Sequence, residues 1–226
     1  YGFQAKISSV RSGYMSTTLK LKTGSRQYLL KVYRTSEVNY EKISFGISAS
    51  FYLKRKGLPT NELICSLYGK VLVCEGENLF LLGKFIDGDC FQPGNRDQLH
   101  AAGSMLGRVH CVGRDMNVFN RQLWKPMWNE RIGELKRILK KLERIPKLKN
   151  DVVQCRVRLA RLEKEVTGET LDAMPTSLIH GDYRAQNLIY NNALISGVLD
   201  FDTARPAQRI FDLAYAMMFF QAVVSV

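Results

Sequence analysis

The sequence predicts an α+β protein with two lobes: an antiparallel sheet with one helix, then a mainly helical part that contains a small β-hairpin. Three observations predict this architecture. Strand-forming residues fill much of the first third of the chain, apolar residues at helical spacing dominate the rest, and two short apolar segments flank Asn191-Asn192. A sheet that precedes a group of helices is typical of the α+β class.

The strands of the first lobe are indicated by alternation and by turn residues. Residues 18–21 alternate, Thr23-Gly24 is a turn signal, and residues 26–33 are rich in strand formers, so we expect a hairpin here. Two further strands are expected at 70–74 and 79–86, on either side of a polar turn.

The helices are indicated by apolar spacing and by capping residues. A helix over 39–56 ends at Gly57 and Pro59, and a second helix follows Asn95 as its N-cap. A basic helical stretch covers 135–164 with an interruption at Pro146. A last helix begins near Phe211, and the hairpin 188–199 precedes it.

Composition and charge bound the class of protein. Five scattered cysteines without a Cys-x-x-Cys pair predict reduced thiols and a cytoplasmic location, and no apolar run approaches the ~20 residues of a membrane helix. The net charge of +12 favours anionic ligands such as nucleotides and disfavours polycations. Residues 131–164 carry 12 basic and 4 acidic side chains, a net charge of +8, which we interpret as a solvated helix face.

The polar segments near the end of the chain carry the chemistry. His180-Gly181-Asp182 leads into Asn187, and the hairpin returns to Asp200. A turn at 191–194 brings Asn187 and Asp200 to the same open end of the hairpin, and carboxylate and amide oxygens suit a hard cation such as Mg²⁺. Asp182 lies in the loop that feeds the hairpin, where a carboxylate can accept a proton from an attacking hydroxyl.

The pattern His-Gly-Asp-x-x-x-x-Asn, followed by Asp200-Phe201 and by Phe211-Asp212-Leu213-Ala214, resembles the aminoglycoside phosphotransferase/choline kinase superfamily. The segments 28–34, 57–59 and 103–110 are similar to type II homoserine kinase-like members. The resemblance implies a protein-kinase-like fold, with a nucleotide-binding lobe at 1–86 and a catalytic lobe at 87–226. It also implies a kinase that moves the γ-phosphate of ATP to a small-molecule hydroxyl.

The resemblance assigns roles in the second lobe. Asp182 would be the catalytic base, and Asn187 and Asp200 would be the Mg²⁺ ligands. His180 and Asp212 would brace the catalytic loop. Because the superfamily closes its acceptor pocket with further helices after the last helix expected here, we expect the natural chain to continue.

The resemblance also assigns the nucleotide site of the first lobe. Lys31 would hold the α- and β-phosphates, with Glu41 as its ion-pair partner and Glu37 as a competing one. The remaining nucleotide contacts would come from the phosphate-covering loop 12–17, with Ser12, Gly13 and Ser16, and from the backbone of a hinge formed by Lys84, Phe85 and Ile86.

Several residues depart from the kinase pattern and leave alternatives open. The phosphate-covering loop has a single glycine, Gly181 stands where protein kinases have Arg, and Asp202 stands where they have Gly. A catalytically silent, spore-coat-like member is one alternative, and an aminoglycoside-type antibiotic kinase is another. Nucleic-acid binding through 131–164 is disfavoured because that stretch lacks interleaved aromatic residues. A hydroxy-amino acid, an amino-alcohol or a sugar could be the acceptor, and the oligomeric state stays open.

Overall fold

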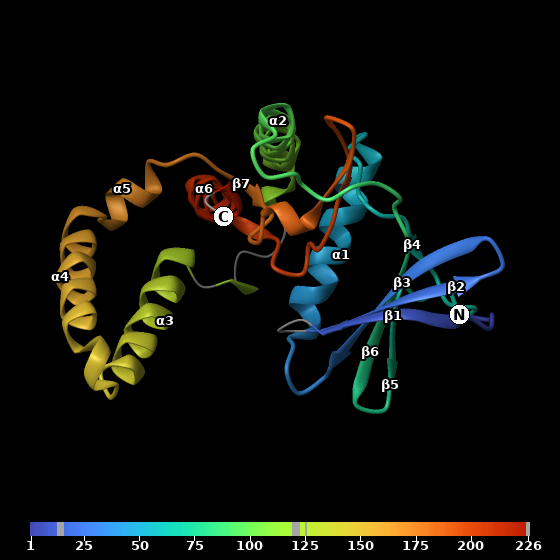
Figure 1. Ribbon diagram of the computed structural model, residues 1–226, viewed down its shortest axis with the longest axis horizontal. Helices are drawn as coiled ribbons and strands as arrows, with labels where there is room; N and C mark the ends of the chain where they lie inside the picture. The colour runs from blue at the N-terminus through green and yellow to red at the C-terminus, as the bar shows by residue number, and fades with distance from the viewer. Residues whose placement is uncertain (13–15, 119–122, 125, 225–226) are drawn as a thin grey trace.

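The computed structural model describes residues 1–12, 16–118, 123–124 and 126–224, and it confirms the predicted α+β, two-lobed fold. The first part is a six-stranded antiparallel sheet in the order β1-β2-β3-β6-β4, with β5 also paired to β6. Figure 1 shows this sheet at one end of the molecule, next to helix α1. Its strands are β1 (Lys6–Ser12), β2 (Thr17–Thr23), β3 (Arg26–Arg34), β4 (Leu63–Ile64), β5 (Leu72–Glu75) and β6 (Asn78–Lys84).

The predicted hairpin is present as β2 and β3, which turn at Thr23-Gly24 and pair Leu30 with Leu19. The sequence analysis did not predict β1 or β4. Strand β1 leaves Ile7 and Val10 exposed, so it lacks the half-buried apolar pattern that marks a strand. Strand β4 has two residues, too few to show a period.

The helices begin close to where their capping residues predict. The side chains of Asn39 and Asn95 accept hydrogen bonds from the backbone of Lys42 and Gln98, which caps α1 and α2. The helices are α1 (Tyr40–Arg55), α2 (Arg96–Val112), α3 (Met127–Leu142), α4 (Lys149–Glu165), α5 (Gly168–Asp172) and α6 (Ile210–Val224).

The basic stretch forms a hairpin of the two helices α3 and α4. The hairpin is interrupted near Pro146, as predicted, but its first helix begins at Met127, earlier than expected. Its two helices pack through a small core of Leu139, Val152 and Leu159. Figure 1 shows this hairpin at the end of the molecule opposite to the sheet. Most of its charged residues are exposed, in line with a solvated face.

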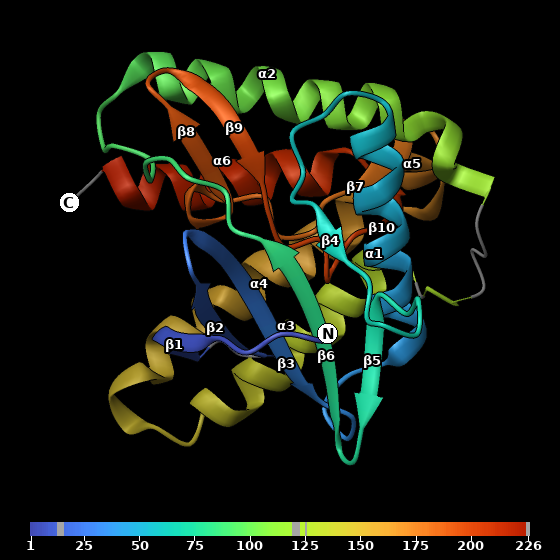
Figure 2. The same cartoon turned by 90° about the vertical axis from the view of Figure 1, so that its right-hand side faces the viewer.

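The main hydrophobic core joins α1 to the helical lobe. Phe45 and Leu53 of α1 belong to the same buried cluster as Leu106 and Val109 of α2. Figure 1 shows α1 between the sheet and the helical lobe, and Figure 2 shows it running upward beside the sheet toward α2. Near the middle of α1, Gly46 lies so close to the carbonyl oxygen of Phe201 that an added Cβ would come well within 3.0 Å of it.

Two small sheets position the polar loops of the helical lobe. Strand β7 (Thr176–Ile179) pairs with β10 (Arg205–Gln208), and β8 (Leu188–Asn191) pairs with β9 (Leu194–Val198). Residues 180–187, called the catalytic loop below after the role that the family resemblance predicts for it, therefore run from β7 to β8, and residues 199–204 run from β9 to β10. The segment at Asp89 is joined to β8 by two backbone hydrogen bonds with Tyr190.

Helix α6 buries Ala216 and Phe220 but exposes Leu213, Met217 and Met218. A search of the described residues for a helix long and apolar enough to cross a bilayer finds none.

Candidate active site

A pocket of about 320 Å³ lies between the sheet and the catalytic loop. It collects residues from both lobes, and at least 99 positions separate the lining residues of one lobe from those of the other. Apolar residues of β3, β4 and β6 line one part of it, and polar residues line the other. The lining residues are Ser9, Ser16, Thr18, Lys20, Leu29, Lys31, Asn61, Leu63, Leu81, Gly83, Phe85, Arg184, Gln186, Asn187, Leu199 and Asp200.

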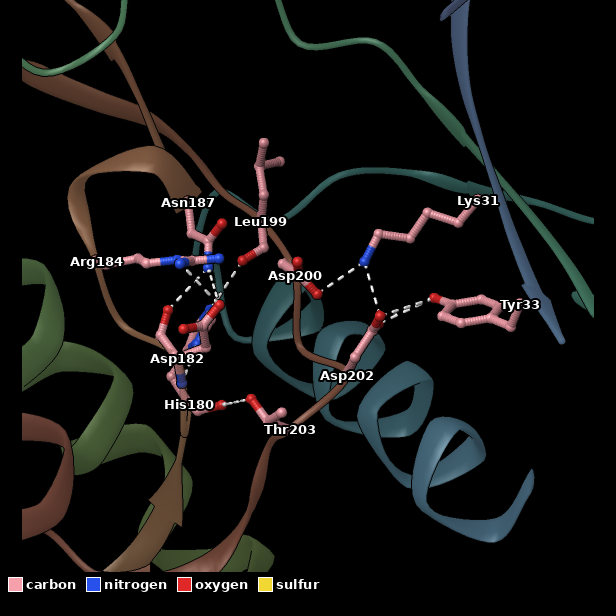
Figure 3. A network of polar contacts seen from close by, with 10 residues as sticks. All are labelled: Lys31, Tyr33, His180, Asp182, Arg184, Asn187, Leu199, Asp200, Asp202 and Thr203. Atoms are coloured by element: carbon pink, nitrogen blue, oxygen red, sulfur yellow. Dashed lines mark hydrogen bonds and ion pairs between the residues drawn. The ribbon is translucent and has the colours of Figure 1, made fainter. Parts of the chain in front are cut away.

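Lys31 reaches from β3 across to the loop that follows β9. Its ammonium nitrogen lies 2.7 Å from Oδ1 of Asp200 and 2.9 Å from Oδ2 of Asp202 (Figure 3). Glu41 was expected to be its partner but is exposed in the first turn of α1. Among the described residues, the ion pairs of Lys31 go to Asp200 and Asp202, which corrects the Glu41 assignment. Glu37 instead lies 3.7 Å from Arg34.

Burial and charge act in opposite directions in this cluster. Burial alone lowers the pKa of Lys31, but the charges of Asp202 and Asp200 outweigh it and raise this pKa well above its usual range. Burial raises the pKa of Asp200, yet the Lys31 charge and hydrogen bond bring it below its usual value. At Asp202 burial prevails, and the pKa is raised. Lys31 is therefore a charged group throughout the neutral pH range.

Asp212 holds the start of the catalytic loop through backbone hydrogen bonds. Its fully buried carboxylate accepts hydrogen bonds from the backbone N–H groups of His180 (2.7 Å) and Gly181 (2.8 Å). Nε2 of His110, at the end of α2, lies 2.9 Å from the same carboxylate. The bracing role predicted for Asp212 thus has a geometric basis, and His110 is an additional member of this cluster.

His180 connects the catalytic loop to the loop after β9. Its Nε2 lies 2.8 Å from the carbonyl oxygen of Leu199, and its own carbonyl accepts a hydrogen bond from Thr203 at 3.2 Å. Gly181 has a φ of 80°, and a Cβ there would lie 2.5 Å from the carbonyl oxygen of Thr203. A side chain at this position would therefore be strained and obstructed, which explains why glycine replaces the Arg of protein kinases.

Asp182 is held from three sides. The side-chain nitrogen of Asn187 donates to its Oδ2 at 2.8 Å, and Nε of Arg184 lies 3.2 Å from the same oxygen. The hydroxyl of Tyr215, on α6, donates to Oδ1 at 2.6 Å. Burial and this hydrogen bond raise the pKa of Tyr215 to about 12, so its phenol stays a donor at any neutral pH.

The donor set fits a divalent cation. Asn187 and Asp200 both line the pocket, and the amide nitrogen of Asn187 is already turned to Asp182. Its amide oxygen and the Asp200 carboxylate are the hard oxygen ligands that Mg²⁺ uses, with phosphates and waters for the rest. Within the described ranges no group of three His, Cys, Asp or Glu side chains could hold a metal alone.

The phosphate-covering loop is only partly described. Ser12 ends β1 and pairs with Thr17 of β2, and Ser16 lines the pocket. Gly13 lies outside the described residues.

The predicted hinge differs from expectation in its hydrogen bonds. The N–H of Lys84 donates to the carbonyl of Glu62 at 2.8 Å, and the N–H of Phe85 donates to the carbonyl of Gln27 at 3.1 Å. These two donors are occupied because β6 continues to pair with its neighbours at this point. Phe85 lines the pocket, whereas the Lys84 ammonium is paired with Glu62 at the surface.

Sequence reasoning did not assign a role to Tyr33, Tyr215 or Asp202. Tyr33 is a fully buried strand residue, and its hydroxyl donates to the Asp202 carboxylate at 3.0 Å. A signal was available for Asp202, because a second acid two residues after Asp200 departs from the kinase triplet. Tyr215 gave no signal, because it is one aromatic residue in an apolar helix.

The two-lobed fold and the polar residues around this pocket define a protein with a protein-kinase-like architecture. Residues 6–225 match the family model described as "Phosphotransferase enzyme family" (APH), and the chain belongs to this family. Among curated relatives, the homoserine kinase of Zymomonas mobilis subsp. mobilis is 26% identical over 210 residues, which is 92% of this chain and 62% of that protein. The homoserine kinase of Neisseria meningitidis serogroup B is 22% identical over 213 residues, covering 93% of this chain and 65% of that protein.

Solved structures share the fold at lower identity. Amicoumacin kinase hAmiN, in complex with AMP-PNP, Ca²⁺ and Ami, superposes with a TM-score of 0.74 and 18% identity over 96% of this chain and 64% of its own. Spectinomycin phosphotransferase APH(9)-Ia, in complex with ADP and spectinomycin, gives a TM-score of 0.68 and 17% identity over 95% and 69%. This chain thus spans less than two thirds of the length of the homoserine kinases described above.

Proposed function

We propose that this chain binds ATP together with Mg²⁺ in the pocket beneath the sheet and transfers the γ-phosphoryl group to a hydroxyl of a small molecule. One observation carries the proposal: Lys31, Asn187 and Asp200 line the same pocket, and the Asp182 carboxylate is hydrogen-bonded to Asn187 at its edge. A cation, two oxygen ligands and a carboxylate base are the groups that phosphoryl transfer requires.

The adenine base would lie in the apolar part of the pocket. Leu29, Leu63 and Leu81 line that part, and Gly83 leaves room beside them. The lobes 1–86 and 87–226 would then close on the nucleotide from opposite sides, with the triphosphate directed toward Lys31.

The chain's own polar residues would orient the reacting groups. Lys31 would hold phosphate oxygens, and Asn187 and Asp200 would hold Mg²⁺, which supplies neutralisation of the phosphate charge. Asp182 would accept the proton of the acceptor hydroxyl through the Oδ1 atom that Tyr215 also contacts. His180 and Asp212 would keep the loop that carries Asp182 in place. Because such reactions depend on positioning, these fixed contacts would provide much of the rate enhancement.

The acceptor is proposed to be a hydroxy-amino acid, with an amino-alcohol and a sugar as the other candidates. The printed names of the curated relatives, homoserine kinases, support this class.

A thermal-unfolding screen tests the nucleotide site. ATP with Mg²⁺ should raise the melting temperature, and ATP in EDTA should do so much less. At a ligand concentration of 100 times the Kd, binding adds about 2.7 kcal/mol of stability. Equal stabilisation in Mg²⁺ and in EDTA would contradict the roles of Asn187 and Asp200.

A matched pair of variants tests the chemistry. Asp182→Asn should abolish phosphoryl transfer to an acceptor panel and retain affinity for ATP with Mg²⁺, because Asp182 acts on the acceptor. Asp172→Asn, at an exposed site in α5, is the control. Turnover by the Asp182 variant would contradict the proposed base. ATP binding by the unaltered chain without transfer to any acceptor would favour the catalytically silent alternative.

A further inference from the structure

Lys31 is held by the loop after β9 and not by helix α1. Two carboxylates of that loop share its ammonium group, at 2.7 Å for Asp200 and 2.9 Å for Asp202. The two differ in position, because Asp200 lines the nucleotide pocket and Asp202 is not among its described lining residues. Figure 3 shows Asp200 meeting the Lys31 ammonium on the side of Asn187 and Asp202 meeting it on the side of Tyr33.

Asp202 is itself fixed by a contact that does not involve Lys31. The hydroxyl of Tyr33 donates to both Asp202 oxygens at 3.0 Å, and Tyr33 is fully buried in the sheet. Tyr33 and Lys31 lie on the same strand, β3, with one residue between them. The carboxylate thus joins two neighbouring residues of one strand and keeps the long Lys31 side chain in one direction.

Helix α1 packs closely against the loop that carries Asp202. At Gly46 the helix lies directly against the backbone of Phe201 and Asp202, which keeps the loop that carries Asp200 and Asp202 close to α1. Glu41 lies more than one turn earlier, at the exposed start of the helix. The close approach at Gly46 therefore explains why Asp202 takes the position that Glu41 was expected to fill.

We propose that Asp202 is the positioning residue that anchors Lys31 for nucleotide phosphates. Asp200 must serve both Lys31 and the divalent cation, so a separate anchor is needed when the metal–nucleotide complex binds. Asp202, held by Tyr33 outside the pocket, can keep its ion pair while Lys31 turns its other protons to the phosphates. The inference rests on the proposed nucleotide role of Lys31.

A double-mutant cycle between Lys31→Met and Asp202→Asn tests this role by the binding of mant-ADP in EDTA, a readout that needs neither metal nor turnover. Asp202→Asn should weaken binding about three- to tenfold, the range expected when a long side chain must be ordered on binding. The same substitution should change nothing further in the Lys31→Met background, because Asp202 acts only through Lys31. Glu37→Gln, at an exposed acid beside α1, is the matched control.

Kinetics provide the second readout. In the chain that retains Lys31, Asp202→Asn should lower kcat/KM for ATP at least tenfold. Tyr33→Phe should lower kcat/KM by a smaller factor. Circular dichroism and unfolding curves would verify that each variant is folded.

The outcomes separate this inference from the proposed function. If Lys31→Met loses mant-ADP affinity but Asp202→Asn keeps or gains it, the anchor role is wrong and the function stands. If Asp202→Asn still lowers mant-ADP affinity in the Lys31→Met background, or lowers it only with Mg²⁺, Asp202 contacts the nucleotide or the metal directly. Either result would overturn its role as the anchor of Lys31. A loss in Glu41→Gln equal to that of Lys31→Met would return the role to Glu41. Absence of mant-ADP binding by the unaltered chain would overturn both proposals.

Discussion

Gly46→Ala tests whether helix α1 packs directly against the loop that carries Asp200 and Asp202. In most helix interiors this change is stabilising, because alanine has a helix propensity about 1 kcal/mol better than glycine. At Gly46 the new Cβ would lie well within 3.0 Å of the Phe201 carbonyl oxygen, whereas ordinary contacts lie at 3.4–4 Å. The obstacle is backbone, which cannot rotate away, so helix and loop must separate.

The expected change in the free energy of unfolding has two opposing contributions. Overpacking of an interior contact destabilises a protein by about 1–3 kcal/mol, and a backbone obstacle this close belongs to the upper half of that range, so the propensity gain of about 1 kcal/mol offsets only part of it. We expect Gly46→Ala to lower the free energy of unfolding by about 1–2 kcal/mol. Gly107→Ala is the control, because Gly107 lies inside α2 with no atom within 4 Å of its would-be Cβ. That variant should gain about 0.5–1 kcal/mol.

Urea unfolding monitored by circular dichroism measures both variants, and mant-ADP titration reports on the site. Because the separation would move Asp200 and Asp202 away from Lys31, Gly46→Ala should also lose nucleotide affinity, and Gly107→Ala should keep it. If Gly46→Ala were as stable as the unaltered chain and bound nucleotide normally, the packing of α1 on this loop would be refuted.

Two further predictions concern buried charges. Asp212→Asn replaces one of two accepting oxygens with a donor that faces backbone N–H groups, so it should lower the free energy of unfolding by at least about 2 kcal/mol. The control Asp115→Asn, at an exposed site, should change it by no more than about 0.5 kcal/mol. Urea unfolding measures both variants. Lys31→Met leaves Asp200 and Asp202 buried without their cation, which raises both pKa values above the unfolded ones. The free energy of unfolding of Lys31→Met, relative to that of the unaltered chain, should therefore fall as the pH rises from about 4 to 7. If the unfolding free energies of the two proteins changed in parallel with pH, this prediction would be contradicted.

Local sequence signals were sufficient for the elements that depend on local interactions. Asn39 and Asn95 cap their helices as predicted, and Thr23-Gly24 turns the β2–β3 hairpin. Strand β10 gave no such signal, because Pro206 and polar neighbours lack the alternation of a strand, and it forms only by pairing with β7. The approach of Asn187 to the strand before Asp200 was also predictable, because it follows from the short β8–β9 hairpin.

The partner of Lys31 could not be predicted in the same way, because it depends on how α1 packs against a loop about 155 positions later. The family resemblance pointed to Glu41, and the spacing within α1 allowed it. The sequence does contain two signals that, taken together, favour the alternative. A glycine in the interior of a helix weakens that helix by about 1 kcal/mol relative to alanine, so Gly46 between the buried Phe45 and Ala49 indicates a close backbone approach. The second acid after Asp200 then supplies a carboxylate on the approaching loop, and the buried Tyr33 hydroxyl supplies its hydrogen-bond donor. A helix glycine paired with a second loop acid would therefore be the pattern to look for in other sequences of this family.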